Sequence, residues 1–166
     1  MDATGLSRVV MVTATITSGL DRARAVAGGV VDPEIPVLTI ADLGILREVR
    51  VEGGAVTVTI TPTYSGCPAM RQIEADLRKA LRVEGFEPVE VRVAQVPTWS
   101  TDWITAEGRR KLSSFGIAPP MPLDAAECPR CRSPEPTVIS RFGSTACKAL
   151  MVCSACGEPF DYFKEF

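Results

Sequence analysis

The chain has 166 residues, of which 46% are hydrophobic and 23% are charged, so it can bury a core and is neither fibrous nor wholly disordered. Its 18 basic and 20 acidic residues give a net charge of −2, without the basic surplus that is typical of a nucleic-acid-binding protein. It has no histidine, which excludes catalysis by a histidine base and every metal site that needs imidazole.

Residues 1–17 hold a short apolar stretch that is broken by threonines and preceded by Asp2, where a secretory signal would carry positive charge. These residues are candidates for disorder. No apolar run in the chain approaches the ~20 residues that span a bilayer. We therefore expect a cytoplasmic protein that binds neither membrane nor nucleic acid.

A short helix is predicted for residues 18–29, because Ser18 is a good N-cap and a glycine pair ends the segment. Residues 32–44, DPEIPVLTIADLG, are rich in turn-forming residues and predict a structured loop. Apolar and polar residues then alternate over 46–52 and 55–62, on either side of a Gly-Gly pair. This pattern predicts a β-hairpin.

The clearest helix begins near Pro68, because the apolar residues that follow recur at three- and four-residue spacing. The residues of this stripe are Met70, Ile73, Leu77 and Leu81. Alternation predicts a strand over 88–96. A further helix is predicted over 105–116, with Thr105 as its N-cap and Gly116 at its end.

The composition changes after residue 116. Residues 117–127 contain three prolines and little periodicity, which indicates a Pro-rich linker. We therefore expect an α+β fold in two parts. A helix–hairpin–helix–strand–helix domain covers residues 1–116, and a small cysteine-rich domain covers residues 128–166.

Two CxxC pairs define the cysteine-rich domain, and 21 residues lie between them. This spacing lets four thiolates surround one metal ion, with strand-like runs at 136–142 and 158–163 forming the hairpin of a zinc ribbon. The four cysteines are Cys128, Cys131, Cys153 and Cys156. Zinc in a structural role is the expected metal, although iron fits the same ligands and a redox-active dithiol is the alternative.

Two further cysteines lie outside this quartet. Cys67 is at the expected start of a helix, where free amides and the helix dipole should lower the pKa of a thiol and favour the reactive thiolate. The alternative is a small buried apolar residue. Cys147 lies between the CxxC pairs, and packing is its favoured role, with a substitute metal ligand and a reactive thiol left open.

The remaining residues do not assemble into an active site. The sequence has no phosphate-binding loop, dinucleotide-binding glycine motif or serine-nucleophile motif. Turn and cap roles explain Asp32, which precedes Pro33, and Asp42, which precedes a Leu-Gly pair. Trp99 and Trp103 are expected in the core or at the interface between the domains. We therefore expect that the chain is not itself an enzyme.

Taken together, these motifs resemble a known family. DPEIPVLTIADLGILREV, followed by a hairpin and then by TPTYSGCP before a helix, resembles the small α+β domain of SUF-associated iron–sulfur cluster assembly proteins. CPRC, FGSTACKAL, CSAC and EPFDYFK resemble the C-terminal part of the D (or J) subunit of bacterial phenylacetyl-CoA epoxidase systems. The resemblance covers the chain from about residue 20 to its end.

The resemblance implies an accessory role in phenylacetate degradation, in which a multicomponent oxygenase epoxidises the ring of phenylacetyl-CoA. Other subunits carry the oxygenase and reductase chemistry, and the D subunit assists assembly of an iron–sulfur cluster, with the reductase as the favoured client. The resemblance assigns the functional thiol to Cys67. Because one thiol cannot complete a cluster site, a second chain in a homodimer or a small thiol must contribute.

Two other functions stay open at this point. The first is a structural adaptor that docks on the oxygenase complex through its ribbon and performs no cluster chemistry. The second is a catalytic oxygenase component, for which the sequence offers no complete set of catalytic residues.

Overall fold

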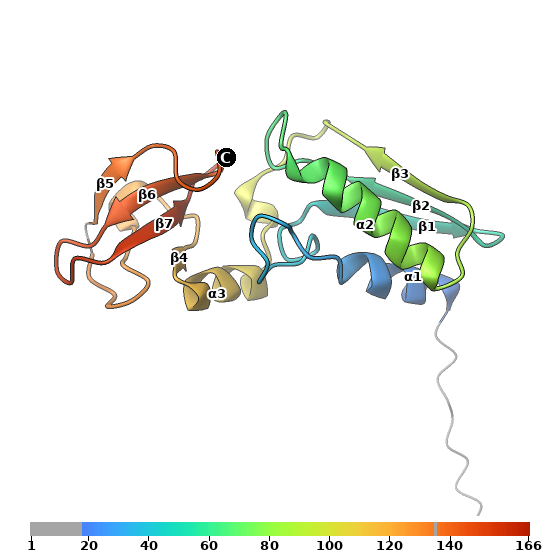
Figure 1. The fold of residues 1–166 in the computed structure, drawn as a ribbon, viewed down its shortest axis with the longest axis horizontal. Helices are drawn as coiled ribbons and strands as arrows, with labels where there is room; N and C mark the ends of the chain where they lie inside the picture. The colour runs from blue at the N-terminus through green and yellow to red at the C-terminus, as the bar shows by residue number, and fades with distance from the viewer. Residues whose placement is uncertain (1–17, 135) are drawn as a thin grey trace, which may run out of the picture.

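A computed structural model of the chain describes residues 18–134 and 136–166 and confirms the α+β class. Two sheets lie side by side, which we call the N-terminal sheet and the ribbon sheet (Figure 1). The disorder expected for residues 1–17 falls outside the described residues. In chain order the elements are α1 Gly19–Gly28, β1 Leu46–Glu52, β2 Ala55–Ile60, α2 Ala69–Val83, β3 Val89–Val93, η1 Thr101–Trp103, α3 Ala106–Phe115, β4 Ile117–Ala118, η2 Leu123–Ala125, β5 Thr137–Ser140, β6 Lys148–Val152 and β7 Pro159–Phe163.

The N-terminal sheet has the strand order β1-β2-β3. The expected antiparallel hairpin joins β1 to β2, and its two turn glycines have φ of 57° and 91°, which glycine adopts without strain. Strand β3 pairs in parallel with β2, and α2 makes the crossover between them. All four residues of the predicted α2 stripe are buried, so this helix covers one face of the sheet (Figure 1).

The two other helices begin and end where the sequence predicts. The Ser18 hydroxyl accepts the backbone N–H of Asp21 at 3.1 Å and caps α1. The Thr105 hydroxyl accepts the N–H of Gly108 at 2.9 Å and caps α3. Gly116 ends α3 in the left-handed conformation, with φ of 87°.

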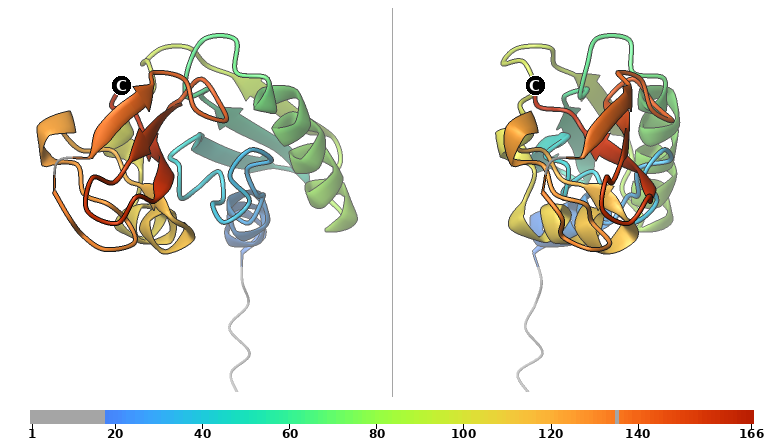
Figure 2. Two further views of the ribbon diagram at one scale, coloured as in Figure 1. Left: turned by 60° about the vertical axis from the view of Figure 1, so that its left-hand side comes forward. Right: turned by 90° about the vertical axis from the view of Figure 1, so that its left-hand side faces the viewer.

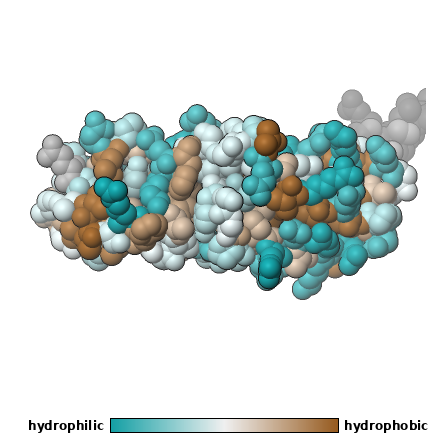
Figure 3. All heavy atoms as spheres, turned by 90° about the horizontal axis from the view of Figure 1, so that it is seen from above, coloured by the Kyte–Doolittle hydropathy of each residue, from teal (hydrophilic) through white to brown (hydrophobic). Residues whose placement is uncertain are grey.

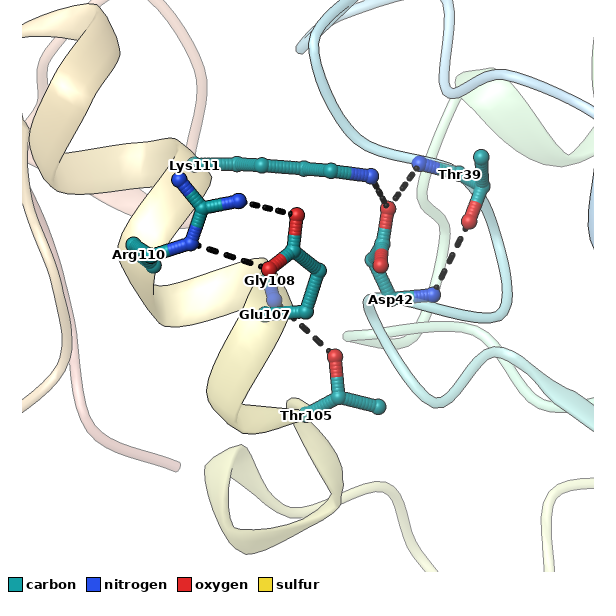
Figure 4. A network of polar contacts seen from close by, with 7 residues as sticks. All are labelled: Thr39, Asp42, Thr105, Glu107, Gly108, Arg110 and Lys111. Carbon is teal, nitrogen blue, oxygen red and sulfur yellow. Dashed lines mark hydrogen bonds and ion pairs between the residues drawn. The ribbon is translucent and has the colours of Figure 1, made fainter.

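The loop over residues 32–44 is held against α3 by Asp42 (Figure 4). The Asp42 carboxylate accepts the N–H of Thr39 at 3.0 Å, which confirms its predicted turn role, and it also pairs with the Lys111 ammonium at 2.7 Å. Burial opposes ionisation, but the bonds from Lys111 and Thr39 hold the pKa of Asp42 below its usual value. Helix α3 approaches this loop closely because Gly108 has no side chain.

The ribbon sheet differs in two ways from the sequence-based expectation. Its strand order is β4-β7-β6-β5, so the two predicted strands do not pair with each other and both pair with β6. Strand β6 was missed because most of its residues are buried without polar–apolar alternation. The stretch expected as a linker, 117–127, contributes β4, which pairs in parallel with β7.

The end of β7 packs on Trp99 and joins the two sheets. The Trp99 indole N–H donates to the carbonyl of Leu43 at 2.9 Å, and its ring centroid lies 6.1 Å from that of Phe163 and 6.2 Å from that of Phe166. The backbone N–H of Thr101 donates to the Phe166 carbonyl at 3.2 Å. Trp99 therefore packs at an interface, as predicted, and the ribbon strands lie next to the loops of the N-terminal sheet (Figure 2).

Two glycine substitutions test the close approach of α3 to the loop. In Gly108→Ala, the new Cβ would lie 2.8 Å from the Asp42 carbonyl oxygen. We expect this clash to lower the free energy of unfolding by about 1–3 kcal/mol, despite the higher helix propensity of alanine.

The matched control is Gly28→Ala, which also lies in a helix and whose new Cβ would meet its nearest neighbour at 3.6 Å. We expect that variant to be unchanged or up to ~1 kcal/mol more stable. Denaturant unfolding monitored by circular dichroism measures both values. Equal stability of the two variants would contradict the close contact.

Candidate functional site

The four cysteines of the CxxC pairs come together beside the ribbon sheet. Their sulfur atoms all lie within 4.8 Å of one another, with Cys128 and Cys156 at 3.9 Å and Cys131 and Cys153 at 3.5 Å. Sulfur atoms at the corners of a zinc tetrahedron are about 3.8 Å apart, given Zn–S bonds of ~2.3 Å. The quartet therefore has the dimensions of a four-coordinate metal site.

Each of the two CxxC pairs lies in its own backbone turn, and the two turns have the same hydrogen-bond pattern. The N–H of Cys128 donates to the carbonyl of Ser133 at 3.0 Å, and the N–H of Cys153 donates to that of Glu158 at 2.9 Å. The carbonyl of the first cysteine in each pair accepts a hydrogen bond, at 2.9 Å, from the N–H of the residue four positions later. In each pair that fourth residue has a positive φ, namely 63° at Arg132 and 73° at Gly157. The repeated turn presents two thiols from each side of the site.

The surroundings of Cys153 favour its thiolate, whereas Cys131 stays protonated: a backbone bond at Ser133 lowers the pKa of Cys131, but the sulfur atoms of Cys153 and Cys156 raise it to about 12. The backbone N–H of Cys156 points at the Cys153 sulfur at 3.4 Å, and together with the N–H of Ala155 it lowers the pKa of Cys153 to about 6. Thiolates are the form that binds metal ions. The quartet thus forms a metal site, and because protein ligands fill all four positions, this site leaves none for a substrate.

Cys67 is half-buried in the loop before α2, and it borders an open cleft of about 610 Å³. Met70 and Arg71 of α2 line the same cleft, as does Gln95, which follows β3. The N–H of Cys67 donates to the carbonyl of Tyr64 at 3.2 Å and fixes the loop. An incoming molecule can therefore reach the rim of the cleft where this thiol lies.

The expectation of a lowered pKa for Cys67 is wrong. Burial raises the pKa of this thiol, and the charges of Glu34 and Asp32 raise it further. The N–H of Ala69 and the hydroxyl of Thr63 act in the opposite direction but do not prevail. Position near a helix start misled the prediction, because the surroundings of the sulfur are partly apolar and partly anionic. Metal binding at this thiol would therefore have to displace its proton.

Two carboxylates of the loop over residues 32–44 act electrostatically on Cys67. Asp32 is only 5% exposed, and its Oδ1 accepts the N–H groups of Glu34 and Ile35, each at 2.8 Å, which confirms its predicted turn role. Burial raises the pKa of Asp32 and of Glu34. Glu34 was not among the residues singled out from the sequence, although the DPE triplet was the signal that could have found it.

Cys147 does not join the quartet. It is 4% exposed and packs in the apolar cluster of the N-terminal sheet together with Phe163, whereas the buried quartet members Cys128 and Cys153 belong to the ribbon cluster. The Thr145 hydroxyl lies 3.0 Å from its sulfur. Burial raises the pKa of the Cys147 thiol. Cys147 is thus buried, but at the junction of the two sheets and not inside the ribbon.

The described residues contain no second cluster of metal-ligand side chains and no helix that could span a membrane. The quartet is the one group of three or more cysteine and acidic side chains in residues 18–134 and 136–166 whose ligand atoms converge as a metal site would require. No helix within the same residues is both long and apolar enough to cross a membrane.

Two family models match the two parts of the chain. A model described as an iron–sulfur cluster assembly protein matches residues 21–93. A model described as the PaaD zinc beta ribbon domain matches residues 120–164. The second match begins inside the stretch that the sequence suggested was a linker.

Known proteins resemble the chain over the same parts. A protein of Escherichia coli (strain K12), named as the D subunit of a "Putative 1,2-phenylacetyl-CoA epoxidase", is 50% identical over 80% of this chain and 85% of its own length. A Porphyromonas gingivalis protein named "Fe-S protein maturation auxiliary factor" is 40% identical over 50% of this chain and 80% of its own. The crystal structure of a domain of unknown function from Bacillus anthracis aligns with a TM-score of 0.52, at 29% identity, over 56% of this chain and 90% of its own.

The fold and the quartet define a chain that joins a domain of the iron–sulfur cluster assembly type to a zinc-ribbon domain. At 50% identity over most of both chains, the match to the Escherichia coli protein is decisive for the family. The chain belongs to the family of phenylacetyl-CoA epoxidase D subunits.

Loss of one quartet ligand tests the metal site. We expect Cys153→Ser to lose its bound metal and the amide protection of β5–β7, because a structural metal contributes on the order of 10 kcal/mol to the folding of a small domain. Helix α2 should keep its protection. Elemental analysis and hydrogen exchange measure these outcomes, with Cys67→Ser as the control that keeps one metal ion per chain. A Cys153→Ser protein with full metal content would contradict the assignment.

Proposed function

We propose that this protein is a non-catalytic maturation factor of the phenylacetyl-CoA epoxidase system, which holds iron–sulfur cargo at Cys67 and passes it to the reductase component. The observation that carries the proposal is the position of this thiol, at an open cleft and near two carboxylates, on a domain of the iron–sulfur cluster assembly type. The Porphyromonas gingivalis relative, named "Fe-S protein maturation auxiliary factor", supports the same role.

The chemistry of the site suits transient binding of iron. Thiolates and carboxylates both bind iron, and Cys67 lies at the surface of the cleft where a client could approach. Gly66, next to it, has φ of 84° and open space where a side chain would stand. A partner's backbone could therefore come close to the thiol without a steric clash.

We also propose that the quartet binds zinc and has a structural role. A four-thiolate tetrahedron is typical of structural zinc, and the match to a zinc beta ribbon model agrees with it. The ribbon is too small to be stable through its own core. In this proposal the zinc stabilises the ribbon, and the cargo binds elsewhere.

An adaptor function is the second candidate, and one observation favours it. Apolar side chains are exposed on and near the ribbon sheet, at the end of the molecule shown on the left of Figure 3. Ile139 is 56% exposed and Phe142 is 69% exposed. Exposed apolar groups of this kind fit docking on another epoxidase component.

A cell-based test separates the two candidates. In a strain without its own copy of this subunit, we expect Cys67→Ser to lower epoxidase activity about tenfold or more, as the loss of a metal ligand would. The iron and sulfide content of the reductase component should fall in parallel. Unchanged activity with Cys67→Ser would contradict the maturation role.

The companion variant is Phe142→Ser, which leaves Cys67 and the quartet in place. Loss of activity with Phe142→Ser, combined with full activity of Cys67→Ser, would establish the adaptor function instead. Equal cellular levels of all variants, measured by immunoblot, are required for either conclusion.

A further inference from the structure

Strand β3 forms a free edge of the N-terminal sheet (Figure 1). On one side it pairs with β2 in a parallel register without a bulge. Among the described residues, no segment forms backbone hydrogen bonds with its other side. A strand edge of this kind presents unpaired N–H and C=O groups, to which another strand can bind.

Three residues of β3 direct their backbone groups to the free edge. The Pro88 carbonyl accepts the N–H of Val56 at 2.9 Å. The Ala94 N–H donates to the Ile60 carbonyl at 2.9 Å, so the even-numbered residues here bond to β2. Successive residues of a strand form their backbone bonds on alternate sides. The residues whose N–H and C=O groups point outward are therefore Val89, Val91 and Val93.

The charged side chains of β3 are self-complementary about its central residue, Val91. Glu90 precedes this residue and Arg92 follows it, and their side chains are 56% and 60% exposed. When a second copy of the chain pairs antiparallel with the two Val91 residues opposite each other, Glu90 of each copy faces Arg92 of the other. These are non-hydrogen-bonded positions, where side chains lie closest. Opposite charges stabilise cross-strand pairs of this kind.

The apolar side chains of β3 fit the same register. Val89 of each copy then faces Val93 of the other, and the outward backbone groups of both residues bond across the edge. Val93 is 43% exposed, so apolar surface is left uncovered at this edge in the single chain. Backbone, charged and apolar groups therefore agree on one symmetric pairing, as a two-fold dimer requires.

The opposite edge of the sheet, β1, is less suited to such pairing. Its register with β2 shifts between Leu46 and Glu48, and an irregularity of this kind hinders the addition of a further strand. The guanidinium of Arg47 lies 3.5 Å from the ring centroid of Trp103, so η1 packs on this end of β1. Strand β1 nevertheless carries the same type of exposed ion pair as β3, Glu48 with Arg50 at 2.8 Å.

We infer that two copies of this chain pair antiparallel through β3 and form a symmetric dimer. The dimer joins the three-stranded N-terminal sheets of both copies into one continuous sheet. Val93 and Gln95 also line the cleft at Cys67, so the second copy borders that cleft. The inference goes beyond the proposed function and does not depend on metal binding at Cys67.

Charge reversal on β3 tests the pairing, because Glu90 and Arg92 are exposed and their replacement leaves the core intact. Sedimentation velocity of the full chain should show a wild-type species of twice 17.8 kDa, which dissociates on dilution because a strand pair is a small interface. Glu90→Arg and Arg92→Glu each place like charges opposite each other, so each should weaken dimerisation about tenfold. An equimolar mixture of the two variants restores the opposite-charge pairs and should dimerise as the wild type does.

Glu48→Arg is the matched control, because it reverses one charge of the equivalent ion pair on β1. This variant should dimerise as tightly as the wild-type protein. Far-ultraviolet circular dichroism and thermal unfolding of each variant establish that the fold is kept.

Three outcomes would overturn the inference. A wild-type species of 17.8 kDa at every concentration up to about 1 mM would exclude the dimer and leave the proposed role of Cys67 intact. A dimer that Glu90→Arg leaves unchanged, or that Glu48→Arg abolishes, would exclude pairing through β3. Failure of the mixed variants to dimerise would exclude the register in which Glu90 faces Arg92.

Discussion

The packing of the end of β7 on Trp99 fixes how the two halves of this protein lie against each other. The Trp99 indole is fixed by its bond to the Leu43 carbonyl, and Phe163 and Phe166 pack against its ring. This contact sets the ribbon against the loop over residues 32–44. A shift of the ribbon would therefore disturb this loop, whose Glu34 and Asp32 carry charges that raise the pKa of Cys67.

The six cysteines of the chain fall into two kinds of environment. The quartet thiols converge in two equivalent backbone turns, so their geometry suits an ion that stays bound. Cys67 and Cys147 lie apart from them, buried or half-buried near carboxylates, with the pKa of each thiol raised. Stable binding requires converged ligands, whereas transfer requires ligands that a cargo can leave.

Local patterns in the sequence predicted the elements that depend on local interactions. The α2 stripe, the Gly-Gly hairpin, the helix caps and the spacing of the quartet each follow from residues close together in the chain. Strand β6 could not be predicted in this way, because it is buried between two strands and lacks alternation. The pairing of Lys111 with Asp42 joins residues 69 positions apart, and the pKa of Cys67 is raised by burial in the fold and further by the charges of Glu34 and Asp32, far earlier in the chain. Such contacts are set by the tertiary fold.

We propose that Cys67 carries iron–sulfur cargo while the quartet holds a structural metal. The most direct measurement is the iron, sulfide and zinc content, together with the visible spectrum, of anaerobically reconstituted wild-type and Cys67→Ser proteins. The account predicts one zinc per chain in both proteins, with iron, sulfide and cluster absorbance in the wild type that the variant lacks. Equal iron and sulfide in both, or none in either, would contradict it.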